Sequence, residues 1–182
     1  GPLASYINNY RFAGKTKPNG FVNICMVTYN RIEFTREALA SIVNYTEYPH
    51  VITIIDNNSN DGTKEYLIAQ RQKGIIKNLV LLEENIGVAR ASNFAWQMEP
   101  EAEYYLKYDN DIVIQKKNWL SSMITVVDAV PEIGALGYNF EPKSYPLVTA
   151  HGVTFRYKEK ENIGGACILI PRRTQAKLGY WC

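Results

Sequence analysis

Val22-Asn23-Ile24-Cys25-Met26-Val27-Thr28 is a short apolar run rich in β-branched residues, with Gly20 before it and Tyr29-Asn30 after it. Such a run between turn-forming residues is typical of a buried β-strand. Residues 33–44 follow with apolar side chains at helical spacing, which predicts a helix that packs back on the strand. The first structural unit that the sequence predicts is therefore a strand followed by a helix.

The same unit recurs along the chain as far as Val130. Further strands are predicted at 51–55, 79–82 and 104–108, and further helices at 63–72, 87–98 and 119–130. We expect Phe94, Trp96 and Met98 of the helix at 87–98 to be core residues. Alternating strands and helices predict an α/β domain with a mainly parallel central sheet, right-handed crossovers and helices on both faces.

The pattern changes at Pro131, and this change sets the expected domain organisation. Later strands are predicted at 135–140, 148–155 and 166–170, without long helices between them, so we expect mixed or antiparallel pairing there. Residues 1–20 are interpreted as a tag scar and an N-terminal extension. Residues 21–182 form one predicted domain, divided into 21–130 and 131–182.

Composition excludes several classes of protein. The 182 residues are 46% hydrophobic and 21% charged, as in ordinary globular proteins, which excludes intrinsic disorder. No apolar run reaches the ~18 residues of a membrane span, so any membrane association is expected to be peripheral. A formal net charge of +2 does not indicate nucleic-acid binding. The three scattered cysteines fit a reducing compartment, and we expect a cytoplasmic protein, at most at the inner face of the membrane.

Polar residues follow each of the first four predicted strands. The four segments are Thr28-Tyr29-Asn30-Arg31, Asp56-Asn57-Asn58-Ser59, Glu84-Asn85-Ile86-Gly87 and Asp109-Asn110-Asp111. Each segment alone is explained by the turn preference of its residues. Ligands of open α/β sheets bind beyond the carboxyl ends of the strands, so the four segments together predict a binding crevice. A Gly-x-Gly-x-x-Gly segment is absent after the first strand, which argues against a dinucleotide enzyme.

Asp109 and Asp111 are candidate metal ligands. Two carboxylates two residues apart, just past a strand, can share a hard divalent cation such as Mg²⁺ or Mn²⁺. Such a cation keeps several waters and takes its other ligands from substrate phosphates. It would stabilise the charge that develops on a departing diphosphate.

Four ordered motifs carry a resemblance to a known family. They are Val27-Thr28-Tyr29-Asn30-Arg31, Ile55-Asp56-Asn57-Asn58-Ser59-x-Asp61-Gly62-Thr63, Asn85-x-Gly87-x-Ala89-Arg90-x-x-Asn93 and Lys107-Tyr108-Asp109-Asn110-Asp111. Over residues 21–175 the sequence resembles the family 2 glycosyltransferases. This resemblance implies a GT-A (Rossmann-like) fold and the transfer of a sugar, with inversion, from a UDP- or TDP-linked donor. The implied acceptor is a glycan or a lipid-linked molecule, and the implied cofactor is Mn²⁺ or Mg²⁺.

The resemblance also implies roles for individual residues. Residues 21–130 would bind the nucleotide-sugar, with Tyr29 stacking on the base and Asp56 accepting a hydrogen bond from a uracil or thymine imide. Asp111 would ligate the metal, and Asp109 would lie near the ribose and the metal. The other residues assigned to the sugar donor are Thr28, Asn30, Arg31, Asn58, Asn85, Gly87, Arg90, Lys107 and Asn110. Residues 131–182 would begin the acceptor side, with Gly164-Gly165 beside the transferred sugar.

The catalytic base is not assigned by these motifs. Family members carry an acidic pair after a segment that Leu178-Gly179-Tyr180 resembles, and the sequence ends at Cys182 before such a pair. We therefore expect a longer chain. His151 is a substitute candidate, with a structural role on its predicted strand as the competing interpretation. The alternative function is a non-catalytic module that binds a nucleotide-sugar or a glycan. A sugar nucleotidyltransferase is disfavoured, because Tyr29-Asn30-Arg31 lacks the Gly-rich loop that such an enzyme needs.

Overall fold

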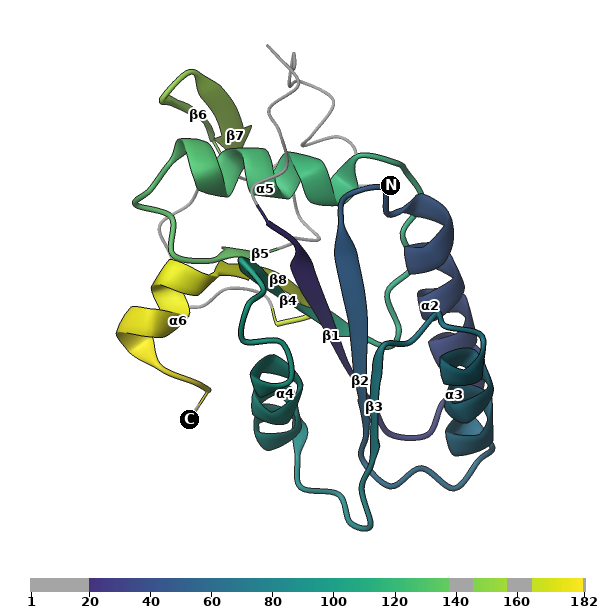
Figure 1. Ribbon diagram of the computed structural model, residues 1–182. Helices are drawn as coiled ribbons and strands as arrows, with labels where there is room; N and C mark the ends of the chain where they lie inside the picture. The colour runs from purple at the N-terminus through teal and green to yellow at the C-terminus, as the bar shows by residue number, and fades with distance from the viewer. Residues whose placement is uncertain (1–19, 138–145, 157–164, 182) are drawn as a thin grey trace.

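The computed structural model describes residues 20–137, 146–156 and 165–181 (Figure 1). The predicted tag scar and extension up to residue 19, and Gly164, lie outside these ranges. The elements in chain order are β1 (Val22–Thr28), α2 (Ile32–Tyr45), β2 (His50–Asp56), α3 (Thr63–Gln72), β3 (Asn78–Leu81), α4 (Val88–Gln97), β4 (Tyr104–Asp109), α5 (Trp119–Ala129), β5 (Leu136–Gly137), β6 (Leu147–Ala150), β7 (Val153–Arg156), β8 (Cys167–Pro171) and α6 (Arg172–Leu178).

The central sheet has the strand order β3-β2-β1-β4-β8-β5. Strands β1 to β4 pair in parallel, and β8 runs antiparallel to both β4 and β5, as predicted for the segment after Pro131. The chain leaves β1 toward β2 and β3, then crosses back to place β4 on the other side of β1. Thr28 is level with Asp56 and Val27 with Asp109. The carboxyl ends of the strands are therefore aligned at the point where the strand order reverses, where α/β sheets bind ligands.

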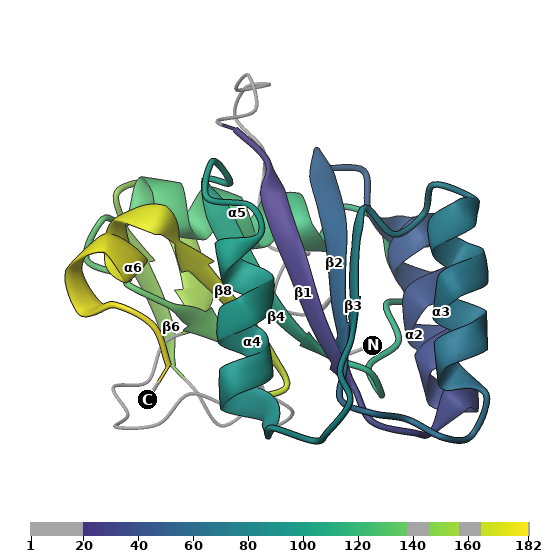
Figure 2. The ribbon, with the colours of Figure 1, turned by 60° about the horizontal axis from the view of Figure 1, so that its bottom comes forward.

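Helices cover both faces of the sheet, as predicted, because alternate residues of each strand point to opposite faces. On one face Ile24 and Met26 of β1 pack with apolar residues of α2, α3 and α5. On the other face Cys25 packs with Ala91, Ala95 and Trp96 of α4. Figure 2 shows α4 on one side of the sheet and α5 on the other. The strands that carry the polar loops are thus held between two apolar layers.

One core prediction is only partly correct. Trp96 is buried, but Phe94 is 52% exposed and Met98 is 38% exposed. Trp96 stacks on Trp181, with ring centroids 5.8 Å apart, so the segment after α6 covers the Trp96 side of α4. The side chains of Phe94 and Met98 lie outside this covered part.

The predicted strand at 148–155 is wrong, because the structure divides it into the hairpin β6–β7. His151 and Gly152 form the turn, with φ values of 51° and 79°. Two consecutive positive φ values suit a tight hairpin turn, whereas an extended strand requires negative ones. Helix α6 was not predicted. Of the predicted strand at 135–140, the structure shows β5, and residues 138–140 lie outside the described ranges. In the described ranges, no helix has the combined length and apolarity that a membrane span requires.

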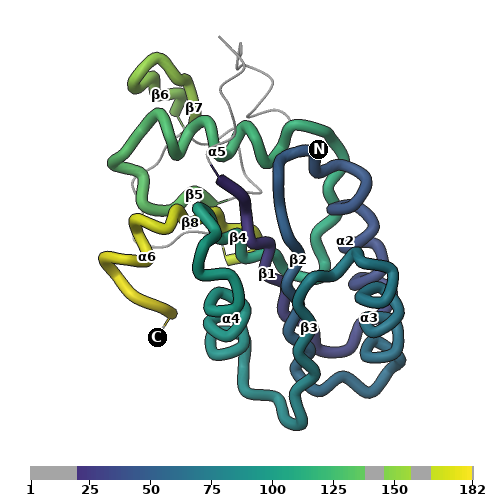
Figure 3. Tube along the Cα trace, viewed as in Figure 1, coloured from purple at the N-terminus to yellow at the C-terminus, as the bar shows by residue number. Residues whose placement is uncertain are grey.

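The Cα tube in Figure 3 shows how the two halves of the chain meet in the sheet. Strand β8, from the C-terminal half, pairs with β4 over its whole length, from Tyr104↔Pro171 to Tyr108↔Cys167. The amino end of β8 therefore lies beside the carboxyl end of β4. This pairing brings Gly165 and Ala166 to the same edge as the polar loops.

Candidate functional site

Asp56, at the end of β2, anchors the polar loops that follow β1 and β2. Its carboxylate accepts hydrogen bonds from Thr28 Oγ1 (2.8 Å), from Ser59 N (2.8 Å) and from Ser59 Oγ (2.5 Å). The residue is 0% exposed. A buried carboxylate is tolerated only with such donors. The structure thus gives Asp56 a role in joining the end of β1 to its own loop, and its contact with a base stays a prediction.

Ser59 connects Asp56 to the loop after β1. Its Oγ accepts a hydrogen bond from Asn30 N (2.7 Å) while donating to Asp56, and Asn60 N donates to Asn30 Oδ1 (2.8 Å). Tyr29, next to Asn30, is 52% exposed at the rim of these loops. An exposed ring on an anchored backbone is available to stack on a planar ligand. Sequence reasoning did not assign Ser59. Asp side chains often accept hydrogen bonds from the backbone that follows them, so the position of Ser59 three residues after Asp56 could have indicated its role.

Asp61 and Lys64 are two further residues of these loops that sequence reasoning did not assign. Asp61 accepts hydrogen bonds from Ile32 N (3.0 Å) and from the Thr63 hydroxyl (2.6 Å). Loss of water raises the pKa of Asp61, but hydrogen bonds from Thr63 and Ile32 outweigh this effect, so its pKa lies below the ordinary value. Lys64 Nζ donates to Asn58 Oδ1 (2.7 Å). Predicted site residue Asn58 is thereby fixed with a positive φ of 71°.

The loop between β3 and α4 is joined to the same cluster. Ile86 N donates to Asn57 Oδ1 (2.9 Å), and Gly87 N donates to Asn85 Oδ1 (2.9 Å). Gly87 has φ 82° and ψ 160°, a conformation that is open almost only to glycine. Arg90 lies on the first turn of α4 and is exposed. Asn57, which no motif assignment included, is the residue that holds this loop in place.

Lys107 and Asp109 link β4 to the segment before β8, where the acceptor side is predicted. Lys107 Nζ donates to Asp109 Oδ1 and to the carbonyl oxygen of Gly165. Asp109 N donates to Ala166 O (2.8 Å). The structure therefore brings Gly165 next to Asp109, and the roles of both residues stay predictions.

Asp111 and Asn110 face the first turn of α2. Arg31 Nη1 lies 3.1 Å from Asp111 Oδ2, and Asn110 Nδ2 donates to Thr35 Oγ1 (3.0 Å). The guanidinium of Arg31 also lies over the Phe34 ring, 5.3 Å from its centroid. The turn after β4 is thereby joined to the loop after β1 by a charged contact and to α2 by a neutral one.

The donor set of the Asp109-Asn110-Asp111 turn fits a hard divalent cation. It offers two carboxylates, and oxygen ligands are those that Mg²⁺ and Mn²⁺ prefer. Within residues 20–137, 146–156 and 165–181, no group of three or more His, Cys, Asp or Glu side chains converges. A cation here would therefore take its remaining ligands from water and from phosphate.

His151 is the predicted candidate that the structure places elsewhere. Its Nε2 lies 3.5 Å from Glu132 Oε2, just beyond α5. Near the same end of α5, Asp128 accepts a hydrogen bond from the Tyr104 hydroxyl at the amino end of β4 (2.7 Å). Figure 1 shows the β6–β7 hairpin beyond α5, away from the carboxyl ends of β1 and β4. The position of His151 therefore argues against a role as general base.

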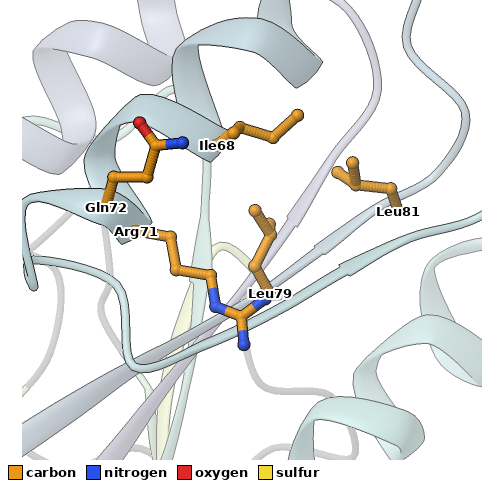
Figure 4. Close-up of a pocket in the computed structure, with 5 residues that line it drawn as sticks. All are labelled: Ile68, Arg71, Gln72, Leu79 and Leu81. Carbon is orange, nitrogen blue, oxygen red and sulfur yellow. The ribbon is translucent and has the colours of Figure 1, made fainter.

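A hollow of about 410 Å³ lies on the edge of the sheet, between α3 and β3 (Figure 4). Its lining residues are Ile68, Arg71, Gln72, Leu79 and Leu81. None of the predicted site residues lines it.

Solved structures similar to this one include a mannosyltransferase and two proteins solved with UDP or a UDP-linked sugar. A mannosyltransferase from Pyrobaculum calidifontis, solved with GDP-Man and Mn²⁺, matches 98% of this chain with a TM-score of 0.72 and 20% identity. S. aureus TarS 1–349 with UDP-GlcNAc matches 59% of the chain with a TM-score of 0.51 and 26% identity. GalNAc-T7 with UDP, GalNAc and Mn²⁺ matches 88% with a TM-score of 0.63 and 15% identity. These matches confirm the predicted GT-A fold.

The matching proteins are longer than this chain. The chain spans 54% of the mannosyltransferase, 31% of TarS and 37% of GalNAc-T7. An uncharacterized protein, L137, of Acanthamoeba polyphaga mimivirus is 24% identical over 68% of this chain and 18% of its own length. Residues 23–168 match the family profile described as Glycosyl transferase family 2, over most of the chain. The chain belongs to glycosyl transferase family 2.

Proposed function

We propose that this domain transfers a sugar from a nucleoside diphosphate sugar to an acceptor hydroxyl, with the help of a divalent cation. The observation that carries the proposal is the meeting of the Asp109-Asn110-Asp111 turn with the loops after β1 and β2 at one edge of the sheet. Gly165, on the acceptor side, is bonded to Lys107 at the same edge. A sugar donor and an acceptor would therefore meet beside Asp109.

The nucleotide would lie over the loops after β1 and β2. Tyr29 offers an exposed ring, and the hydrogen bonds of Ser59 hold its backbone, so the base would stack without ordering the loop first. The nucleotide would be UDP or TDP, with Asp56 near the base. Similar structures contain GDP-Man or UDP-linked ligands, so GDP is included in the test.

Transfer would proceed by attack of the acceptor hydroxyl on the anomeric carbon, with inversion. A new C–O bond forms as the bond between the sugar and the β-phosphate oxygen breaks, and the electron pair leaves with the diphosphate. A divalent cation held by Asp109 and Asp111 would supply stabilisation of that negative charge. The acceptor proton goes to a general base, a role for which the position of His151 is unsuitable.

The acceptor and the setting of the reaction remain part of the proposal. We propose a glycan or a lipid-linked molecule as the acceptor, in the cytoplasm, with peripheral association to the membrane at most. The alternative of a non-catalytic module predicts binding of the nucleotide-sugar without turnover. Product analysis after incubation with UDP- and GDP-linked sugars distinguishes the two, because only the enzyme releases free nucleoside diphosphate.

The test is a thermal-unfolding panel of UDP, TDP and GDP with and without Mn²⁺. A ligand at 100 times its Kd stabilises the fold by about 2.7 kcal/mol, which raises the Tm by ~5–10 °C in a domain of this size. The increase should require Mn²⁺ and should be lost in Asp111→Ala. Glu132→Ala is the matched control, because Glu132 lies beside His151, away from the crevice. An increase that needs neither Mn²⁺ nor Asp111 would contradict the proposed metal role.

A further inference from the structure

Both carboxylates of the Asp109-Asn110-Asp111 turn already face a basic side chain. Lys107, two residues before Asp109 on the same strand, pairs with it locally. Arg31 reaches Asp111 from a different loop, 80 residues earlier in the chain, with 3.1 Å between Nη1 and Oδ2. The charge of Asp111 is therefore balanced from outside its own turn.

The backbone that presents Arg31 is unusual. Asn30 and Arg31 both have positive φ values, 56° and 63°, which are uncommon for residues other than glycine. Arg31 also directly precedes α2, where the positive end of the helix dipole disfavours a cation. Hydrogen bonds to Ser59 Oγ from Asn30 N and to Asp61 Oδ2 from Ile32 N hold this conformation. Here two positive φ values and a cation at a helix N-terminus are each unfavourable locally, and hydrogen bonds to the loop after β2 compensate for them. Such compensated strain is typical of functional positions.

The guanidinium of Arg31 is oriented but weakly held. It lies over the Phe34 ring and pairs with Asp111, so its direction is defined. The side chains of Arg31 and Asp111 are 58% and 43% exposed, and water competes for both. Exposed ion pairs contribute little to stability. Arg31 can therefore leave Asp111 at little cost when a better partner arrives.

We infer that Arg31 is an internal counter-ion of Asp111 that changes partner during ligand binding. Without ligands it neutralises Asp111. When Asp111 takes a divalent cation, the guanidinium is repelled and turns to the diphosphate of the sugar donor, whose oxygens match its planar fork. The inference rests on the proposed function, and adds that Arg31 opposes binding of the cation alone while favouring binding of the diphosphate.

This exchange makes the cation and the sugar donor bind cooperatively. The cation alone must compete with Arg31, whereas the cation with a diphosphate finds the guanidinium a new partner. Loss of Arg31 should therefore strengthen binding of the cation alone and weaken binding of the nucleoside diphosphate. A purely structural ion pair predicts a different result, because loosening the loop of Asp111 would weaken both.

The experiment measures Mn²⁺ binding alone, from the paramagnetic resonance signal of free Mn²⁺, and UDP and GDP binding by calorimetry in the presence of Mn²⁺. Arg31→Gln should bind Mn²⁺ alone about two- to fivefold more tightly. It should bind the preferred nucleotide about tenfold more weakly. Arg36→Gln is the matched control, since Arg36 is also half exposed on α2, pairs with Glu33 and lies over the Tyr66 ring. This control should change neither affinity.

Arg31→Lys separates charge from shape. It should restore the Mn²⁺ affinity of the wild type but only part of the nucleotide affinity, because lysine lacks the planar fork. Unchanged or weaker Mn²⁺ binding by Arg31→Gln would overturn the exchange and leave the proposed function intact, provided that the wild type binds a nucleotide with Mn²⁺. If the wild type shows no metal-dependent nucleotide binding, the proposed function and the exchange are both refuted.

Discussion

Replacing Ser59 by alanine tests how the loops of the crevice are held together. Ser59 Oγ donates to Asp56 Oδ2 over 2.5 Å and accepts from Asn30 N over 2.7 Å. The residue is only 3% exposed. Without this oxygen, one carboxylate oxygen of buried Asp56 keeps Thr28 as its partner, and Asn30 N loses its acceptor. Because the substitution leaves the backbone unchanged, its effect comes from these two bonds.

The expected loss follows from the chemistry of the two bonds. A hydrogen bond to a charged group contributes about 1.5–3 kcal/mol, and a bond from a neutral N–H to a hydroxyl about 0.5–1.5 kcal/mol. Thr28 still donates a hydrogen bond to Asp56 in the variant, so we use the lower part of these two energy ranges. We expect Ser59→Ala to lower the free energy of unfolding by ~2–3 kcal/mol. In a domain of this size, this corresponds to a decrease of ~4–12 °C in Tm.

Urea unfolding followed by tryptophan fluorescence measures this loss. Ser121→Ala is the control, because Ser121 Oγ donates to Asn118 O at an exposed position in the first turn of α5. It should change the free energy of unfolding by less than ~0.5 kcal/mol. Equal urea midpoints for Ser59→Ala and Ser121→Ala would refute the role of Ser59 as the anchor of both loops.

Two further predictions concern backbone conformation and pH. Gly87→Ala should cost about 1–3 kcal/mol through strain at φ 82° and ψ 160° alone, because an added Cβ meets no atom within 4 Å. Gly165→Ala, also with free space, is its control, and equal unfolding energies for the two variants would contradict the strain argument. Burial raises the pKa of Glu99, but hydrogen bonds from Lys77 and Asn78 and the charge of Lys77 hold it below the ordinary value of 4.5. Its stabilisation is therefore complete above pH 4.5 and is lost as the pH falls through the lowered pKa. Acid titrations of Tm for the wild type and Glu99→Gln check this, and equal steepness below pH 4.5 would count against it.

The inner strands β1, β2 and β4 of the central sheet could be predicted from the sequence because most of their residues are buried on both faces. Residues 22–28 and 51–55 are continuous apolar runs that end at polar turn residues, and both became parallel neighbours in the sheet. The reversal of strand order around β1 then brought the predicted loops together. Periodicity and turn chemistry are local properties, so they locate such elements well.

The other features of the fold and of the candidate site depend on contacts between residues far apart in the sequence, which a local pattern does not indicate. Helix α6 has no buried residue, so it lacks the apolar stripe by which a helix is recognised. The turn at His151 divides a run of β-forming residues that reads as one strand. Ser59 and Asn57 are buried polar residues whose partners, Asn30 and Ile86, lie 29 residues away in each case. Their role follows from the fold and not from their sequence neighbours.

The antiparallel course of β8 has a consequence for how this crevice can vary. The loops proposed to bind the nucleotide follow the strands β1, β2, β3 and β4, whereas Gly165 and Ala166, on the proposed acceptor side, precede β8. One side of the crevice is thus built where strands end and the other where a strand begins. A change in the length of the connection into β8 would alter the proposed acceptor side, while Lys107 and Asp109 keep their places in β4. Under the proposed function, acceptor choice and nucleotide choice can therefore change independently within one sheet.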